Sequence, residues 1–162
     1  MEMAGCLILL ALIMSLTLYG LNNAVILANT ASVDAQLLKL KDECKSMLLS
    51  PAGNVMDTTS TPGLTRKVSL TLPDSVEYVS FGFDPCSGNS HEGTIYYNVA
   101  GTKKAVIVDE RVSFRESSEE GSKMPSQRYL MITSGGRYEI IFELVYDPAS
   151  GKKYLVSYDM SY

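Results

Sequence analysis

An uncharged apolar run near the N-terminus constrains this chain more than any other feature. Between Glu2 and Asp34 lie 31 residues without a charged side chain, and most of them are Leu, Ile, Val, Ala or Met. About 20 helical residues cross the apolar core of a bilayer, and each large apolar side chain left in water forgoes about 1.5–3 kcal/mol. The run therefore requires lipid or a protein interior around it.

A cleaved secretory signal fits this run poorly, because such signals begin with a basic region and have an apolar stretch of roughly 7–15 residues. No Lys or Arg precedes Lys39. A membrane anchor fits the length, but the positive-inside tendency of Lys39, Lys41 and Lys45 would place the C-terminal region in the cytoplasm. A short basic leader that once preceded Met1 would remove this conflict, and we expect the sequence to be such a mature form.

The helix is predicted to continue past the apolar run as an amphipathic half. One stripe with spacings of 4, 3, 4 and 3 is typical of helix packing, while charged residues occupy the other faces; the stripe is Val33, Leu37, Leu40, Cys44 and Met47. Helix-breaking residues follow at positions 50–54. The pattern predicts one helix of about 45–50 residues, near 70 Å long, within an assembly segment of residues 1–53.

Two adjacent asparagines interrupt the apolar half and leave two interpretations open. In a bundle of protein helices, Asn22 and Asn23 would hydrogen-bond to a neighbouring helix, and Gly20 would permit close approach or a local bend. Alternatively, both side chains lie near the lipid headgroups, because polar groups are costly only inside the bilayer.

From Leu64 onward apolar residues alternate with a period of two, which predicts half-buried strands. Turns are expected at residues 73–74, 84–89, 134–139 (a hairpin turn) and 147–151 (a hairpin), and shorter strands at 105–109, 112–115 and 129–133. The longer strands place these residues on single faces: Val68, Leu70 and Leu72; Val79, Phe81 and Phe83; Ile95, Tyr97 and Val99; Tyr138, Ile140, Phe142, Leu144 and Tyr146; Tyr154, Val156 and Tyr158.

Seven or eight short strands with no helix among them predict an antiparallel sandwich or barrel, and about 100 residues is the usual size of an immunoglobulin-like sandwich. We therefore expect an α+β fold: a long N-terminal hydrophobic α-helix, a hinge at residues 54–63, and an antiparallel all-β, immunoglobulin-like head at residues 64–162.

The sequence offers little for catalysis or for binding nucleic acid. The single histidine, His91, lies in a Ser/Gly/Asn-rich loop, and no nucleophile elbow, phosphate-binding loop or metalloprotease helix occurs. Residues 51–162 carry 11 basic and 14 acidic side chains with no basic patch. Acidic residues that calcium could be imagined to use lack the spacing of a calcium loop: Asp109, Glu110, Glu116, Glu119 and Glu120. We expect no enzyme activity, no cofactor or metal, no nucleic acid and no small-molecule substrate.

Three cysteines allow at most one internal disulfide. A bond between Cys44 and Cys86 would join the helix to the head and stabilise by about 3–4 kcal/mol; the alternative is two unrelated thiols. Cys6 is expected to be a small buried hydrophobe in the apolar helix.

The order of these parts, an apolar helix, its amphipathic extension and a β head, resembles the type IV pilin superfamily, and its archaeal branch most. The stretch "LTRKVSLTLPDSVEYVSFGF" (64–83) is similar to the first hairpin after the helix of archaeal pilin-like subunits, and "AVILANTAS" (24–32) is similar to the helix of archaellins. The resemblance assigns Glu2 as the acidic residue that pairs with a neighbour's amine, although it lies earlier than usual. The glycine-rich start of archaellins is absent, and no cysteine follows Cys86 to close the C-terminal disulfide loop of bacterial pilins.

The expected function is that of a structural subunit of an extracellular, type IV pilus-like filament. The subunit would wait in the membrane as a precursor and then polymerise with identical copies through its helix, while the head forms the outer shell and serves in adhesion. The alternative is a single-pass anchored surface protein, or a minor pilin, whose head binds a partner. The residues expected to assemble are Glu2, Leu7, Leu10, Met14, Leu18, Leu21, Asn22, Asn23 and Val25, and those expected to seat the head on the helix are Val33, Leu37, Leu40 and Met47.

Overall fold

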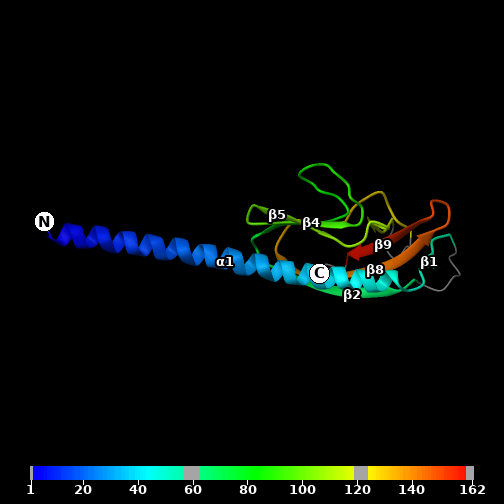
Figure 1. The fold of residues 1–162 in the computed structure, drawn as a ribbon, viewed down its shortest axis with the longest axis horizontal. Coiled ribbons are helices and arrows are strands. Elements are labelled where there is room, and N and C mark those ends of the chain that lie inside the picture. The colour runs from blue at the N-terminus through cyan, green and yellow to red at the C-terminus, as the bar shows by residue number, and fades with distance from the viewer. Residues whose placement is uncertain (1, 57–62, 119–123, 160–162) are drawn as a thin grey trace.

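The computed structural model describes residues 2–56, 63–118 and 124–159, and it has the α+β architecture that the sequence predicts. A single long helix carries a β head at its C-terminal half, and its N-terminal half projects away from the head as a bare rod (Figure 1). The elements are α1 (Glu2–Leu48), β1 (Gly53–Asn54), β2 (Thr65–Leu72), β3 (Val76–Phe81), β4 (Thr94–Val99), β5 (Thr102–Ile107), β6 (Val112–Glu116), β7 (Met131–Ile132), β8 (Gly136–Asp147) and β9 (Lys152–Asp159).

Helix α1 has 47 residues and no interruption at Gly20 or at the two asparagines. Its last turn tightens, because the N–H of Ser50 donates to the carbonyl of Met47 at 2.9 Å. Pro51 follows and cannot continue the helix. The helix therefore ends at Leu48, as the breakers at residues 50–54 predict.

The head consists of two facing sheets. One sheet has the order β1-β8-β9-β6, with β2 also paired to β8, and the other has the order β5-β4-β3-β7. Most pairings are antiparallel, but β1 pairs with β8 in parallel and β6 pairs with β9 in parallel. The expectation of a purely antiparallel head is wrong at these two pairings, since period-two alternation carries no information about strand direction.

Two turns that were predicted as hairpins instead connect the two sheets. Strand β2 pairs with β8, whereas β3 pairs with β4 and β7, so the corner at Pro73-Asp74 is a crossover. The turn before β8 likewise joins β7 in one sheet to β8 in the other. A short turn is compatible with either path, and only the partner strands decide between them. The predicted hairpin at residues 147–151 is confirmed, because Asp147 and Lys152 are paired in register.

The β4–β5 hairpin has a strained connection. Ala100 and Gly101 form its two-residue turn between the paired Val99 and Thr102, with φ angles of 48° and 79°. Such turns match the twist of the strands and favour Asn-Gly at these positions. Alanine at the first position adopts a left-handed conformation that a Cβ disfavours.

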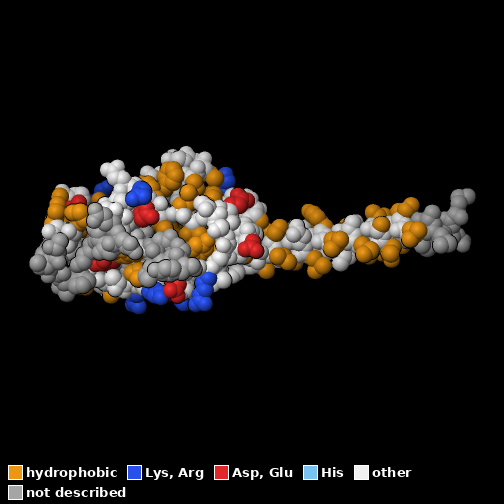
Figure 2. All heavy atoms as spheres, turned by 180° about the vertical axis from the view of Figure 1, so that it is seen from behind, with side chains coloured by type: hydrophobic (Ala, Val, Ile, Leu, Met, Phe, Trp, Pro, Cys, Tyr) orange, Lys and Arg blue, Asp and Glu red, His pale blue; other side chains and the backbone are white. Residues whose placement is uncertain are grey.

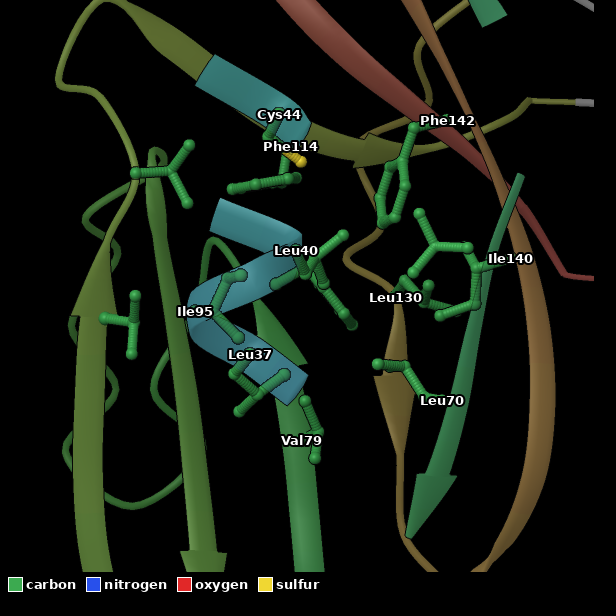
Figure 3. Packing of buried hydrophobic residues seen from close by; sticks show 14 of the residues in the cluster. Leu37, Leu40, Cys44, Leu70, Val79, Ile95, Phe114, Leu130, Ile140 and Phe142 are labelled. Atoms are coloured by element: carbon green, nitrogen blue, oxygen red, sulfur yellow. The ribbon is translucent and has the colours of Figure 1, made fainter. Parts of the chain in front are cut away.

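The main core lies between the sheets and is built around the second half of α1. Figure 3 shows Leu37, Leu40 and Cys44 of the helix among side chains from both sheets. Residues of α1 contact β2 of one sheet and both β4 and β5 of the other. The sheets also meet directly through three rings, Phe81, Phe114 and Phe142, whose centroids lie 5.6–5.9 Å apart.

A second, smaller cluster covers the opposite face of β8 and β9. It contains Val55, Val145 and Val156, with Tyr154 and Tyr158 packed against it. The face predicted for β9 from Tyr154, Val156 and Tyr158 is therefore real, but it belongs to this cluster, and the main core receives Leu155 instead.

The two ends of the expected hinge are docked on the head. Asn54 belongs to β1 and pairs with Tyr146 of β8. At the other end the N–H of Gly63 donates to the buried carboxylate of Glu143 at 3.0 Å, and the Tyr158 hydroxyl donates to the same carboxylate at 2.9 Å. The middle of the hinge, residues 57–62, lies outside the described residues.

Candidate functional site

The projecting half of α1 is the most unusual surface of the molecule. From Leu7 to Leu27, thirteen large apolar side chains are 54–71% exposed, on every side of the helix, while Ile26 is half-buried. Figure 2 shows these hydrophobic side chains along the rod, in contrast to the charged groups on the head. The helix is long and apolar enough to cross a membrane, and its most apolar window is not buried by the rest of the chain.

The residues predicted to assemble lie on this exposed half. They do not form one patch, because they are distributed around the helix; those with described side chains are Leu7, Leu10, Met14, Leu18, Leu21, Asn22, Asn23 and Val25. The side chains of Glu2 and Cys6 lie outside the described residues, so neither the proposed amine pairing nor the burial of Cys6 is tested.

Polar side chains within the projecting half differ in whether the helix itself satisfies them. The hydroxyls of Ser15 and Thr17 donate to the carbonyls of Leu12 and Ile13, at 3.0 and 2.7 Å. The amides of Asn22 and Asn23 are exposed and have no side-chain hydrogen bond among the described residues. The two asparagine amides and the hydroxyl of exposed Tyr19, which also has no hydrogen bond among the described residues, are therefore the groups in this half that the helix leaves without a partner.

Three polar side chains tie the helix to the head where the rod begins. The Asn29 amide donates to the Ser75 hydroxyl at 3.1 Å. The Gln36 side chain pairs with the Thr71 backbone, accepting its N–H at 2.7 Å and donating to its carbonyl at 2.8 Å. These two hydrogen bonds to one residue resemble the pairing between neighbouring strands. They therefore fix the position of the helix along β2.

The third tie joins α1 to the other sheet. The Asp34 carboxylate accepts from the Tyr97 hydroxyl at 2.8 Å and pairs with the Lys104 ammonium at 2.5 Å. Burial, followed by the hydrogen bond to Asp34, raises the pKa of Tyr97, so the phenol stays protonated as a donor. Asn29, Asp34 and Gln36 were not predicted as contact residues. The sequence signal that could have indicated them is their position, since Asn29 lies one turn before the buried stripe that starts at Val33 and the other two are adjacent to it.

The residues expected to seat the head on its helix all lie in the main core. Val33, Leu37, Leu40 and Met47 are 0–1% exposed. Full burial of such side chains contributes about 1.5–3 kcal/mol each. The second half of α1 is therefore part of the head's core, and the rod and the head share one continuous element.

The two described cysteines are free thiols, so the disulfide alternative is not supported. Cys44 is buried in the core and Cys86 is exposed in the loop after β3. Burial, with a further contribution from the charge of Glu43, raises the pKa of the Cys44 thiol to about 12. A neutral buried thiol is unreactive, so Cys44 acts as a small apolar core residue.

The ionisable groups of the head form local ion pairs. The Glu92 carboxylate accepts from the Ser113 hydroxyl at 2.5 Å, pairs with Arg115 and lies 3.6 Å from the Lys152 ammonium. Burial acts to raise the pKa of Glu92, but these donors and charges outweigh it and lower the pKa below 4.5. His91 is exposed next to Glu92.

Of the acidic residues weighed as calcium ligands, Asp109 and Glu116 face arginines, Glu110 is exposed, and the other two are not described. Asp109 pairs with Arg111 at 2.8 Å, and hydrogen bonds from Arg111 lower its pKa to about 2. Glu116 lies 3.7 Å from Arg128, while Glu119 and Glu120 lie outside the described residues. Among the residues that the structure describes, no group of three His, Cys, Asp or Glu side chains could hold a metal ion.

Two open hollows lie on the head, within the described part of the chain. One of about 810 Å³ lies at the C-terminal end of α1, between Leu49, Tyr146 and Lys153. The other, of about 620 Å³, lies on the outer face of β4 and β5 beside His91 and Ile107. The first hollow has Asp109 in its lining, which pairs with Arg111. The second is lined by Glu92 and Glu110 as well as His91, and its Glu92 carboxylate is engaged by Ser113 and Arg115. No protein-family model, curated protein or solved structure gives a significant match to the chain.

Proposed function

We propose that the protein is a structural subunit of an extracellular type IV pilus-like filament, held in the membrane by its helix before it polymerises. The observation that carries this proposal is the rod: an uncharged helix, apolar on every side and rigidly continuous with the core of a β head. Thirteen large apolar side chains between Leu7 and Leu27 are exposed. At about 1.5–3 kcal/mol each, leaving them in water would cost tens of kcal/mol.

Lipid alone would satisfy most of this surface. The span from Leu7 to Leu27 is about 31 Å long at ~1.5 Å per residue, close to the ~30 Å apolar core of a bilayer. This match favours the second candidate, a single-pass surface protein or minor pilin whose head binds a partner. In that case the head, proposed as immunoglobulin-like, would carry the function on its own.

The asparagines favour the filament over the simple anchor. Asn22 and Asn23 lie five and four residues before the end of the apolar span at Leu27, and the helix does not satisfy their amides. In a bundle of helices an Asn amide finds partners on neighbouring chains. A rod apolar on all sides also needs neighbours on all sides, which identical copies supply more simply than one foreign partner.

The test uses the native cell surface. We expect material sheared from cells that produce this chain to contain thin fibres in negative stain, labelled along their length by an antibody against the head. Mass spectrometry should identify this chain as their main component. Antibody label confined to the detergent-extracted membrane fraction, with the chain as single molecules, would exclude the filament and leave the anchored surface protein.

The role of the asparagines is tested with a matched pair of variants. Replacing both Asn22 and Asn23 with Leu should preserve membrane insertion and reduce filament yield, because the interchain hydrogen bonds are lost. The control replaces Ser15 with Ala and Thr17 with Val, whose hydroxyls are already satisfied within the helix. Equal filament yield from both double variants would show that the asparagines have no part in assembly.

A further inference from the structure

Strand β5 lies at the margin of its sheet, with a neighbouring strand on one side only. All of its residues except Val106 are exposed. The other sheet margins are short or engaged: β7 has two residues, β6 exchanges backbone hydrogen bonds with residues 126 and 128 at Glu116, and the Gln36 side chain bonds to β2 at Thr71. Within the described residues, β5 has no hydrogen bond along its outer edge.

The register of the β4–β5 hairpin shows which backbone groups this edge offers. The two-residue turn makes Val99 and Thr102 a hydrogen-bonded pair, and such pairs recur at every second residue. Lys103, Ala105 and Ile107 alternate with them, so their N–H and C=O groups point away from β4. Each of these three residues can therefore form two hydrogen bonds with a strand laid beside β5.

The hollow on the outer face of β4 and β5 lies directly beside this edge. Ala105 and Tyr96 are paired across the two strands and both line the hollow, as does Ile107, which is 57% exposed. Alternate side chains of an added strand would project over the same face of the sheet. The edge and the hollow therefore form one site, with backbone groups to hold an extended chain and an apolar recess for one of its side chains.

Opposite charges lie at the two ends of the site. Lys103 is exposed at one end and Glu110 at the other, and neither has an ion pair among the described residues. No Lys or Arg lines the hollow, and its second acid, Glu92, is already engaged by Arg115. A lysine on a strand edge opposes the addition of a wholly apolar strand. The occupant must therefore place an acidic residue beside Lys103 and a basic residue near Glu110.

We propose that the edge of β5 binds an extended segment of another protein, which adds to the sheet as a further strand. Its residues facing the hollow are basic, apolar and acidic at every second position, in this order for the antiparallel direction, which gives the stronger pairing. The apolar side chain lies over Ala105 against Tyr96, and the aliphatic part of the basic one covers Ile107. This inference goes beyond the filament proposal and does not depend on it, because it concerns the head alone.

The first test measures the charge preference with synthetic peptides. The probe is fluorescein-labelled TRTVTET, and the control is TRTVTRT, which places an arginine beside Lys103 in either strand direction. In an anisotropy titration with the full chain in nonionic detergent, TRTVTET should bind at least about threefold more tightly, because like charges facing each other destabilise a strand pair. Equal affinities, or no binding of TRTVTET at millimolar chain concentration, would overturn the proposal.

The second test blocks the middle of the edge. Ala105→Pro removes an N–H that points away from β4 and places the proline ring in the path of the added strand, whereas the bonds between β4 and β5 are kept. Its affinity for TRTVTET should fall at least about tenfold. The control Ala105→Val keeps the N–H and should keep the affinity, and thermal unfolding would show that both variants are folded. Wild-type affinity of Ala105→Pro would refute strand addition at β5.

A third variant tests the site through a change of preference. Lys103→Glu replaces one exposed side chain and should make the chain bind TRTVTRT more tightly than TRTVTET; an unchanged preference would refute the assigned charges. Sedimentation of the wild type in the same detergent tests a different occupant. A dimer that Ala105→Pro dissociates would show that the edges of two copies pair with each other, and would overturn the binding of a foreign segment.

Discussion

A pair of neighbouring leucines on α1 tests whether the second half of the helix belongs to the core of the head. Leu37 is fully buried between the sheets, while Leu38 is 50% exposed. Replacing a fully buried Leu with Ala typically costs about 2–5 kcal/mol, from lost burial and the cavity left behind. Surface substitutions usually change stability by less than about 0.5 kcal/mol, and alanine is a slightly better helix former.

We therefore expect Leu37→Ala to destabilise the head by at least about 2 kcal/mol more than Leu38→Ala. For a chain of this size, about 3 kcal/mol lowers the thermal midpoint by roughly 6–12 °C. The assay is urea or thermal unfolding of the full chain in nonionic detergent, followed by tyrosine fluorescence, since the chain has 10 Tyr and no Trp. Equal unfolding free energies for the two variants, within 0.5 kcal/mol, would show that the helix is not part of the head's core.

Three further outcomes follow from the head. In the folded protein iodoacetamide should label Cys86 and leave Cys44 unmodified until urea is added, as peptide mass spectrometry would show; labelling of both at similar rates would contradict the burial of Cys44. Ala100→Asn should raise the unfolding free energy by about 0.5–1 kcal/mol, since Asn tolerates the left-handed turn conformation better than Ala; an unchanged or lower value would argue against the strained turn. The pKa of Glu92 is lowered in the fold, so the ionised carboxylate stabilises the head fully above pH 4.5, and this stabilisation is lost as the pH falls further. In Glu92→Gln the thermal midpoint should therefore fall less steeply with decreasing pH below 4.5 than in the wild type. An unchanged slope would exclude this contribution.

The helix was predictable because its signal is local and repeated. The absence of charge between Glu2 and Asp34 and the 4-3-4-3 stripe that starts at Val33 indicate both halves of α1. The strands β2, β3, β4, β8 and β9 follow from period-two alternation for the same reason. Each of these patterns depends only on residues within the element.

The pairing of the strands depends on distant residues and was not predictable. Strand β1, only Gly53–Asn54, exists because β8 offers it a parallel edge, and its own residues indicate a helix end. The corner at Pro73-Asp74 has the composition of a turn whether it closes a hairpin or crosses between sheets. Alternation in β9 separates two faces, but the presence of the second cluster decides which of Leu155 and Val156 enters the main core.

The candidate functional surface was likewise predictable only in part. The exposed apolar rod is visible in the sequence, because nothing in the chain could cover 31 uncharged residues without a second apolar element of similar length. The ties of Asn29, Asp34 and Gln36 to the head are not visible, since their partners Ser75, Thr71, Tyr97 and Lys104 lie 35 or more residues away. A helix residue with such remote partners looks like any exposed polar residue until the fold is known.

The unbroken passage of α1 from rod to head has a mechanical consequence. A pull on the head is transmitted along a single helix whose backbone hydrogen bonds run parallel to the force, with no flexible joint at Asn29 or Asp34 to absorb it. If the rod were held and the head pulled away from it, Leu37 and Leu40 would have to leave the core between the sheets. Separating the head from the rod therefore requires the head to unfold. The force that α1 can transmit to the head is therefore limited by the stability of the core that surrounds it.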